Sequence, residues 1–100
     1  QVKFPNDIDI VFPVLHGYFG EDGGIQELLD ATGTPYVGSG ASASRLMMDK
    51  VATKAAVRAK GLPAPDEVRI PTPATPIPAD LTFPVIVKPN RQGSSVGVTR

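Results

Sequence analysis

A lysine, glycines and two serines lie close together near the end of the sequence. The apolar run 85–87 ends in Lys88, and the loop that follows contains Gly93, Ser94 and Ser95. Backbone N–H groups and hydroxyls in such a loop can surround a phosphate while the lysine supplies positive charge. The lysine precedes the glycines, so this is not a Walker A loop. The pattern indicates nucleotide chemistry, and an ordinary hairpin turn with polar residues remains the alternative.

A second group of polar residues follows the first apolar run of the chain. His16 is the only histidine in the sequence, and Glu21 and Asp22 follow it within the glycine-rich stretch 16–24. A structural role is one interpretation, because carboxylates in the first turn of a helix are stabilised by its dipole. One histidine beside two adjacent acids does not have the spacing of a metal site. The stretch alone leaves its role open, and we assign no metal to it.

Three basic residues share one face of a predicted helix. Lys50, Lys54 and Arg58 recur every four residues, which places them on the same side of an α-helix. Composition favours a solvated helix face for these three side chains.

The first part of the chain has the order of elements found in open α/β sheets. Residues 8–15 are nearly continuously apolar and rich in β-branched side chains, which predicts a buried parallel strand. Apolar spacing predicts a helix over 24–31, and a short strand follows at 35–37. Ligands collect at the carboxyl ends of parallel strands, where the stretch 16–24 lies.

The rest of the sequence predicts a helix, an irregular spacer and a hairpin. Residues 41–60 are rich in good helix formers, and Asp49 is placed to cap a second helical segment that begins at Lys50. Four prolines between 71 and 78 predict polyproline II or irregular loop, since proline breaks both helix and ladder hydrogen bonding. Apolar runs on both sides of the late glycine-rich loop predict strand–loop–strand.

The overall composition excludes several classes of protein. Ten basic and ten acidic residues cancel, so nothing argues for a nucleic-acid partner or an anionic membrane surface. No run of about 18 apolar residues occurs, as a spanning helix would need. The absence of cysteine excludes a disulfide framework and thiol catalysis, which fits a cytoplasmic protein. We expect these residues to be a segment of a larger protein.

Five motifs occur in one order along the chain. They are His16-Gly17-x-x-Gly20-Glu21-Asp22-Gly23, Pro35-Tyr36-Val37-Gly38, Met48-Asp49-Lys50-x-x-x-Lys54, Gly61-Leu62-Pro63 and Val87-Lys88-Pro89-x-x-x-Gly93-Ser94-Ser95-x-Gly97-Val98. From about residue 8 to residue 100, this series resembles the D-alanine–D-alanine ligases, ATP-grasp enzymes that make a peptidoglycan precursor.

The resemblance implies an enzyme that ligates two D-alanines at the expense of ATP. In that family ATP phosphorylates the carboxylate of the first D-alanine, and the amine of the second attacks the acylphosphate. His16, Gly17 and Glu21 match residues of the amino-acid site near the first D-alanine. Ser94 matches the serine that helps to close the site over the substrate. Ser94 and His16 are the implied catalytic residues.

The resemblance also implies a nucleotide site. Lys50 and Lys88 match the two lysines of the family that contact ATP, and their charges would offset the negative charge that grows during phosphoryl transfer. Gly93, Ser94 and Ser95 match the part of the loop that meets the phosphates. Family members use Mg²⁺ or Mn²⁺, and the residues that match its ligands lie outside this chain.

The implied fold class is α/β, in two parts. Residues 1–38 would form the rear part of an N-terminal Rossmann-like α/β domain, and residues 39–100 would begin the central ATP-grasp domain as its first lobe. Family members are cytoplasmic and generally homodimeric, with no nucleic-acid or membrane partner.

The sequence departs from the family pattern in two places. The connection between Pro63 and Pro84 is shorter and richer in proline, and Glu27 stands where the family commonly has glycine. Three alternatives therefore stay open: a D-alanine–D-lactate ligase, another ATP-grasp carboxylate–amine ligase, and a truncated relative without catalysis.

The isolated chain is expected to be inactive, because the resemblance places the metal ligands and the adenine site outside it. It is also expected to bind ATP weakly or not at all. We expect marginal stability, since apolar faces around Val11, Phe12, Leu28 and Ile86 would lack cover.

Overall fold

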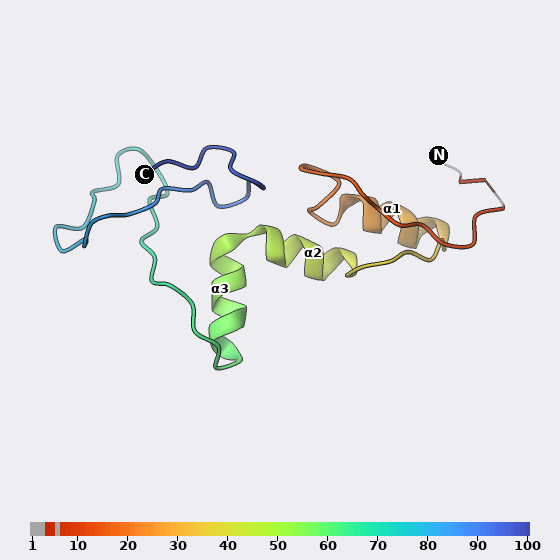
Figure 1. The fold of residues 1–100 in the computed structure, drawn as a ribbon, viewed down its shortest axis with the longest axis horizontal. Coiled ribbons are helices and arrows are strands. Elements are labelled where there is room, and N and C mark those ends of the chain that lie inside the picture. The colour runs from red at the N-terminus through yellow and green to blue at the C-terminus, as the bar shows by residue number, and fades with distance from the viewer. Residues whose placement is uncertain (1–3, 6) are drawn as a thin grey trace.

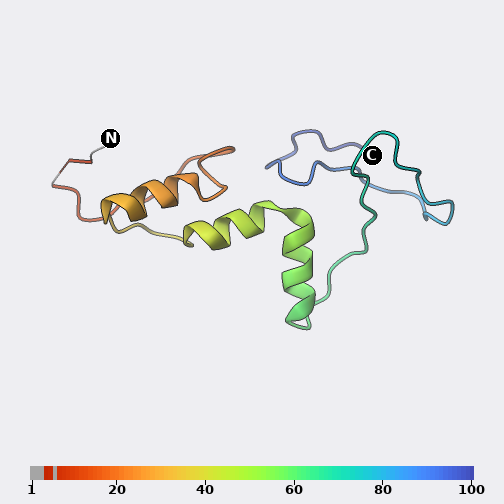
Figure 2. The same ribbon diagram turned by 180° about the vertical axis from the view of Figure 1, so that it is seen from behind.

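The path of the chain is elongated around a row of three helices. The computed structural model describes residues 4–5 and 7–100, with principal extents of 59 × 30 × 19 Å. Its radius of gyration is 17.6 Å, well above the roughly 13 Å of a compact domain of this length. The helices are α1 (Gly24–Thr32), α2 (Ala41–Met48) and α3 (Lys50–Ala59). In both views the loop before α1 points toward the loop near the C-terminus (Figures 1 and 2).

Glycines in the left-handed region begin and end α1. Gly23 precedes the helix at φ 93° and Gly33 follows it at φ 68°, angles that glycine adopts without the penalty of a Cβ atom. The Gly33 N–H donates to the Asp30 carbonyl oxygen (3.1 Å), which satisfies a carbonyl left free at the helix end. The helix predicted over 24–31 is confirmed, and it extends one residue further.

The buried core lies on one face of α1. Leu29 is fully buried and Ile25 is nearly so, and their spacing of four residues places them on the same side of the helix. Gln26 is buried beside them. The apolar periodicity that predicted the helix is thus also the pattern that builds the core.

Many large apolar side chains outside α1 remain at the surface. Phe12 is 70% exposed and Ile86 is 60% exposed, as expected from the sequence, whereas Val11 and Leu28 are half-buried. Burial of apolar surface is the dominant favourable term in folding. The described chain therefore gains little from it, and its local structure depends largely on caps, turns and loop contacts.

The predicted strands occur as single bridges. Val11 pairs with Tyr36 in parallel through two N–H···O bonds of 2.9 Å, and Val87 pairs with Thr99 in antiparallel through bonds of 2.7 and 2.9 Å. The prediction of regular strands was therefore wrong in their length, because within the described residues each segment pairs with its partner at a single position. The directions of pairing agree with the predictions: parallel in the strand–helix–strand unit and antiparallel in the hairpin.

α2 and α3 meet at a residue that serves both. Asp49 has extended backbone angles (φ −91°, ψ 109°), which ends α2 and starts α3 in a new direction (Figure 1). Its side chain accepts a hydrogen bond from Ala52 N–H (2.9 Å), as a helix N-cap does. The predicted cap is confirmed.

The chain from 61 to 100 has no helix, and its proline-rich part is irregular, as the sequence predicts. None of the helices among the described residues is long and apolar enough to cross a membrane.

Candidate active site

Two loops from opposite ends of the chain meet at one pocket. The pocket has a volume of about 460 Å³. We call residues 16–23 the early loop and residues 88–97 the late loop. The pocket is lined by His16, Gly17 and Glu21 from the early loop and by Gln92, Gly93, Ser94 and Val96 from the late loop. A hollow of similar volume at the other end of α1 contains none of the predicted site residues.

The early loop is held in shape by its two carboxylates. Gly17 N–H donates to Oε2 of Glu21 (2.6 Å), which turns the loop back on itself. Asp22 accepts from Phe19 N–H (3.0 Å) and from Gly24 N–H (3.1 Å). The bond from Phe19, and next the bond from Gly24, lower the pKa of Asp22 below its ordinary value.

The two loops touch where Glu21 lies against Gly93. A Cβ atom at Gly93 would stand 3.1 Å from Oε2 of Glu21 and 3.4 Å from the terminal methyl of Met48. Glycine at this position therefore lets the Glu21 carboxylate pack directly against the backbone of the late loop. Glu21 thus contacts both loops, at Gly17 and at Gly93.

The late loop is a narrow turn closed at its base by the bridge between Val87 and Thr99. Gly97 has φ 67°, and a Cβ atom there would lie 2.7 Å from Cγ of Pro89. A side chain at Gly97 would therefore force the two arms apart. Ser94 at the tip also has positive φ (53°), which is uncommon for a residue with a side chain. The tight geometry predicted for this loop is confirmed at Gly97.

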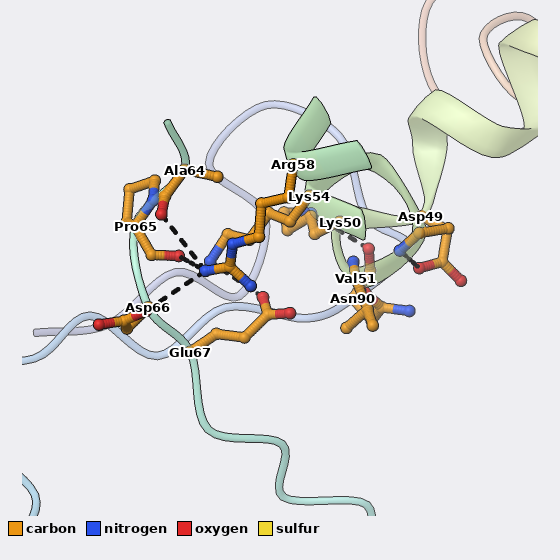
Figure 3. Close-up of polar contacts among 11 residues, drawn as sticks. Asp49, Lys50, Val51, Lys54, Arg58, Ala64, Pro65, Asp66, Glu67 and Asn90 are labelled. Carbon is orange, nitrogen blue, oxygen red and sulfur yellow. Dashed lines mark hydrogen bonds and ion pairs between the residues drawn. The ribbon is translucent and has the colours of Figure 1, made fainter. Parts of the chain in front are cut away.

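Lys50 lies against the first arm of the late loop. Its Nζ donates to the carbonyl oxygens of Gln92 (2.7 Å) and Asn90 (3.5 Å). The basic face of α3 is directed at the returning chain over its whole length (Figure 3). Lys54 pairs with Glu67 (2.9 Å).

Arg58 completes that face. Its Nη2 donates to the carbonyl oxygens of Ala64 (3.3 Å) and Pro65 (2.7 Å) and to Asp66 (3.4 Å). The interpretation of the three basic residues as a solvated face was therefore wrong for Lys50 and Lys54, which the chain at 90–92 and at Glu67 partly covers. It holds for Arg58, which is exposed although it contacts residues 64–66.

The structure brings five predicted site residues together and leaves three outside the pocket. His16, Gly17, Glu21, Gly93 and Ser94 line it. Lys50 contacts the late loop at Asn90 and Gln92, while Lys88 and Ser95 are exposed on that loop and do not line the pocket. Within the described residues no three His, Cys, Asp or Glu side chains gather as a metal site would require.

Sequence reasoning missed the residues that join α3 to the late loop. Asn90 accepts from the backbone of α3, and Gln92 accepts from Lys50. Arg91 pairs with Asp49 (3.0 Å). About forty positions separate the partners, and no periodicity connects them. Only Asp49 gave a hint in the sequence: a helix cap uses one of its two carboxylate oxygens, which leaves the other free to accept from a distant residue.

Two family models cover most of the chain. Residues 1–39 match the model of the D-ala D-ala ligase N-terminus, and residues 64–100 match the model of the D-ala D-ala ligase C-terminus. The chain belongs to the D-alanine–D-alanine ligase family. It is 52% identical over 99 residues to the D-alanine–D-alanine ligase of Frankia casuarinae, a match that covers 96% of this chain. The chain spans 26% of the length of that relative.

Solved ligases have similar structures. The D-alanine–D-alanine ligase of Bacillus anthracis complexed with ATP matches with a TM-score of 0.74 and 39% identity, over 86% of this chain and 31% of that one. The VanG D-Ala:D-Ser ligase of Enterococcus faecalis matches with a TM-score of 0.73 and 38% identity, over 91% of this chain and 28% of that one. The fold of this ligase segment is thus shared with members that differ in their second amino acid.

Asp22 predicts a pH dependence for the stability of the early loop. Its pKa is lower in the folded chain than its ordinary value of 3.8, so its bonds stabilise the fold above that pH and are lost as the pH falls below it. In the full-length ligase, Asp22→Asn should lower the melting temperature at pH 6. That difference from the wild type should shrink as the pH falls toward 3. A gap that stays constant over this range in thermal melts would contradict the assignment.

Proposed function

We propose that this chain carries the amino-acid site and part of the nucleotide site of an ATP-dependent D-alanine–D-alanine ligase. The observation that carries the proposal is the meeting of the early and late loops at one pocket. Membership of the ligase family supports the reaction class. The product would be the D-alanyl-D-alanine unit of a peptidoglycan precursor.

The proposed reaction has two steps. A carboxylate oxygen of the first D-alanine attacks the γ-phosphorus of ATP, and ADP leaves. The amine of the second D-alanine then attacks the acyl carbon of D-alanyl phosphate, loses a proton and displaces inorganic phosphate. Both steps require the carboxylate and the γ-phosphate to be held together with little water, as where two loops close on one pocket.

We assign the early-loop residues to the first D-alanine. His16 and Gly17 line the pocket, and Glu21 fixes the early loop against Gly93. Ser94 lines the same pocket from the late loop. It is therefore the proposed hydroxyl that contacts the substrate while the late loop closes.

We assign the late loop and the side chain of Lys50, the first residue of α3, to ATP. Gly93 and Ser95 would present backbone N–H groups and a hydroxyl to the phosphates, and Lys50 and Lys88 would supply positive charge. The ATP complex of the Bacillus anthracis ligase supports ATP as the phosphoryl donor. The described residues do not hold a donor set for Mg²⁺ or Mn²⁺, so no step is assigned to a metal ion here.

The domain assignment follows the same lines. We propose that residues 1–38 belong to an N-terminal Rossmann-like domain and residues 39–100 to the first lobe of an ATP-grasp domain. The parent ligase is proposed to be a cytoplasmic homodimer, in which D-alanine and ATP are the only partners considered.

The alternative function that a specific observation supports is a ligase with a different second substrate. The VanG ligase, which joins D-Ala to D-Ser, has a comparable TM-score and identity. We assign the pocket described above to the first amino acid, so its residues do not show whether the second substrate is D-alanine or D-serine. D-alanine is proposed because the curated relative from Frankia casuarinae is a D-alanine–D-alanine ligase.

The test is a substrate comparison with the full-length ligase. Phosphate release from ATP should depend on D-alanine and should yield D-alanyl-D-alanine as the main product when D-alanine, D-serine and D-lactate compete. Mixed products dominated by D-serine or D-lactate would reassign the second substrate. No amino-acid-dependent phosphate release would contradict the proposed function itself.

Glu21 provides a sharper test of the pocket. Glu21→Ala removes the carboxylate that contacts Gly17 and Gly93, so the KM for D-alanine should rise by about tenfold. The matched control is Glu27→Ala, which removes an exposed acid paired with Arg45 on the surface. Initial rates against D-alanine concentration measure both, and an equal change in the two variants would refute the role of Glu21.

A further inference from the structure

The start of α3 is joined to the late loop by a set of short contacts. Asn90 accepts twice from the backbone of α3: its carbonyl oxygen from Lys50 N–H (3.1 Å) and its side-chain oxygen from Val51 N–H (3.1 Å). Nζ of Lys50 reaches over to Gln92 O (2.7 Å). Figure 3 shows Asp49, Lys50, Val51 and Asn90 gathered at this end of the helix.

These contacts occupy the N–H groups that a helix start leaves free. The first N–H groups of an α-helix have no partner within the helix and commonly bind a cap, water or an anion. In α3 those of Lys50 and Val51 donate to Asn90, and that of Ala52 donates to Asp49. The helix start is therefore used to hold the late loop, and it is not free to bind phosphate.

Asp49 makes two different contacts with its two oxygens. Oδ1 accepts from Ala52 N–H (2.9 Å) and caps the helix, while Oδ2 accepts from Nε of Arg91 (3.0 Å). The Asp49 side chain is 18% exposed, and Arg91 is largely exposed. The bond from Ala52, with the Asn90 amide and the Arg91 guanidinium beside it, lowers the pKa of Asp49 to about 2. The carboxylate thus stays charged and able to hold the arginine at neutral pH.

We propose that Asp49 and Arg91 are positioning residues that fix the late loop to the helix carrying Lys50, so that Lys50 and Ser95 contact the same phosphates. The proposal rests on the proposed function for its effect on catalysis. Its structural part, the fixing of the loop, does not depend on the reaction.

The substitution Asp49→Asn separates the contact of Asp49 with Ala52 from its contact with Arg91. Asn is as good an N-cap as Asp, so Asp49→Asn keeps the bond to Ala52 N–H. The amide loses the charge and the second acceptor oxygen that face Arg91. Arg91→Gln removes the same contact from the loop side and changes a mostly exposed side chain. Arg45→Gln is the matched control, because Arg45 forms a surface ion pair with Glu27 away from the late loop.

Hydrogen exchange in the full-length ligase tests the fixing of the loop without substrate. Peptides covering residues 88–97 should exchange on the order of tenfold faster in Asp49→Asn and in Arg91→Gln than in the wild type. The double variant should be no faster than either single one, because both remove one contact. Arg45→Gln should match the wild type.

Kinetics tests the consequence for catalysis. The KM for ATP should rise by about fivefold in Asp49→Asn and Arg91→Gln, while the melting temperature stays close to that of the wild type. Unchanged loop exchange, or effects that add in the double variant, would overturn the proposal. A wild-type ligase with no D-alanine-dependent activity would instead refute the proposed function, and the exchange result would still decide the role of the pair.

Discussion

Lys50→Met in the full-length ligase is expected to lower kcat/KM for ATP by about 10²–10³-fold. Nζ of Lys50 lies 2.7 Å from the carbonyl oxygen of Gln92, in the loop that we assign to the phosphates. The proposed phosphoryl transfer would build negative charge there, and a fixed positive charge would lower the energy of that charge. Methionine keeps the apolar stem of the side chain and removes the charge. Initial rates at varied ATP concentration measure the loss.

Lys54→Met is the matched control for Lys50. Lys54 lies one turn further along the same face of α3 and pairs with Glu67 (2.9 Å), away from the late loop. Its loss should change kcat/KM by less than about threefold, since a partly exposed ion pair contributes little to stability. Equal losses in the two variants would show that the basic face acts through the fold of α3, and the assignment of Lys50 to ATP would be wrong.

Gly23→Ala is expected to cause a large loss of stability. Gly23 is buried, has φ 93°, and a Cβ atom there would overlap the carbonyl oxygen of Ala41 at the start of α2. Both the backbone angle and the overlap oppose any side chain. Together they should lower the free energy of unfolding by about 3 kcal/mol. Urea denaturation of the full-length ligase measures it.

Gly33→Ala separates the two causes of the stability loss expected in Gly23→Ala, the backbone angle and the overlap with Ala41. Gly33 also has positive φ (68°), but a Cβ atom there would meet open space. Only the backbone penalty applies, and the loss should be about 1 kcal/mol. If both variants lost the same free energy, close packing between the start of α1 and the start of α2 would not be a feature of the ligase.

The sequence predicted the local structure well where one segment determines it. The apolar spacing of Ile25, Leu28 and Leu29 gave α1, with Gly33 as its stop. The residue type of Asp49 gave the cap that divides α2 from α3. Caps and helical faces depend on neighbours within four residues, which a single sequence displays.

Contacts between distant segments were not predictable in the same way. The face formed by Lys50, Lys54 and Arg58 looked solvated, because nothing in its spacing shows that Glu67 and Gln92 return to cover it. The extent of the strands failed for a related reason, since a strand needs a partner and periodicity does not say how many residues will pair.

The candidate site was predicted mainly from the order of the motifs along the chain, and only partly from the chemistry of the individual side chains. His16, Glu21 and Ser94 were ambiguous one by one, and the structure brings them to one pocket. Lys88 and Ser95 do not line it, so their assignment to ATP stays a prediction. The link through Asn90 and Arg91 came from the structure alone.

Transfer of an oxygen atom tests the central claim most directly. The full-length ligase is supplied with ATP and with D-alanine labelled with ¹⁸O at both carboxylate oxygens, and the released phosphate is analysed by mass spectrometry. If D-alanyl phosphate forms, one ¹⁸O atom should pass to each phosphate for each dipeptide made, because the second step breaks the bond between acyl carbon and oxygen. Unlabelled phosphate, or release of AMP and pyrophosphate, would contradict the account.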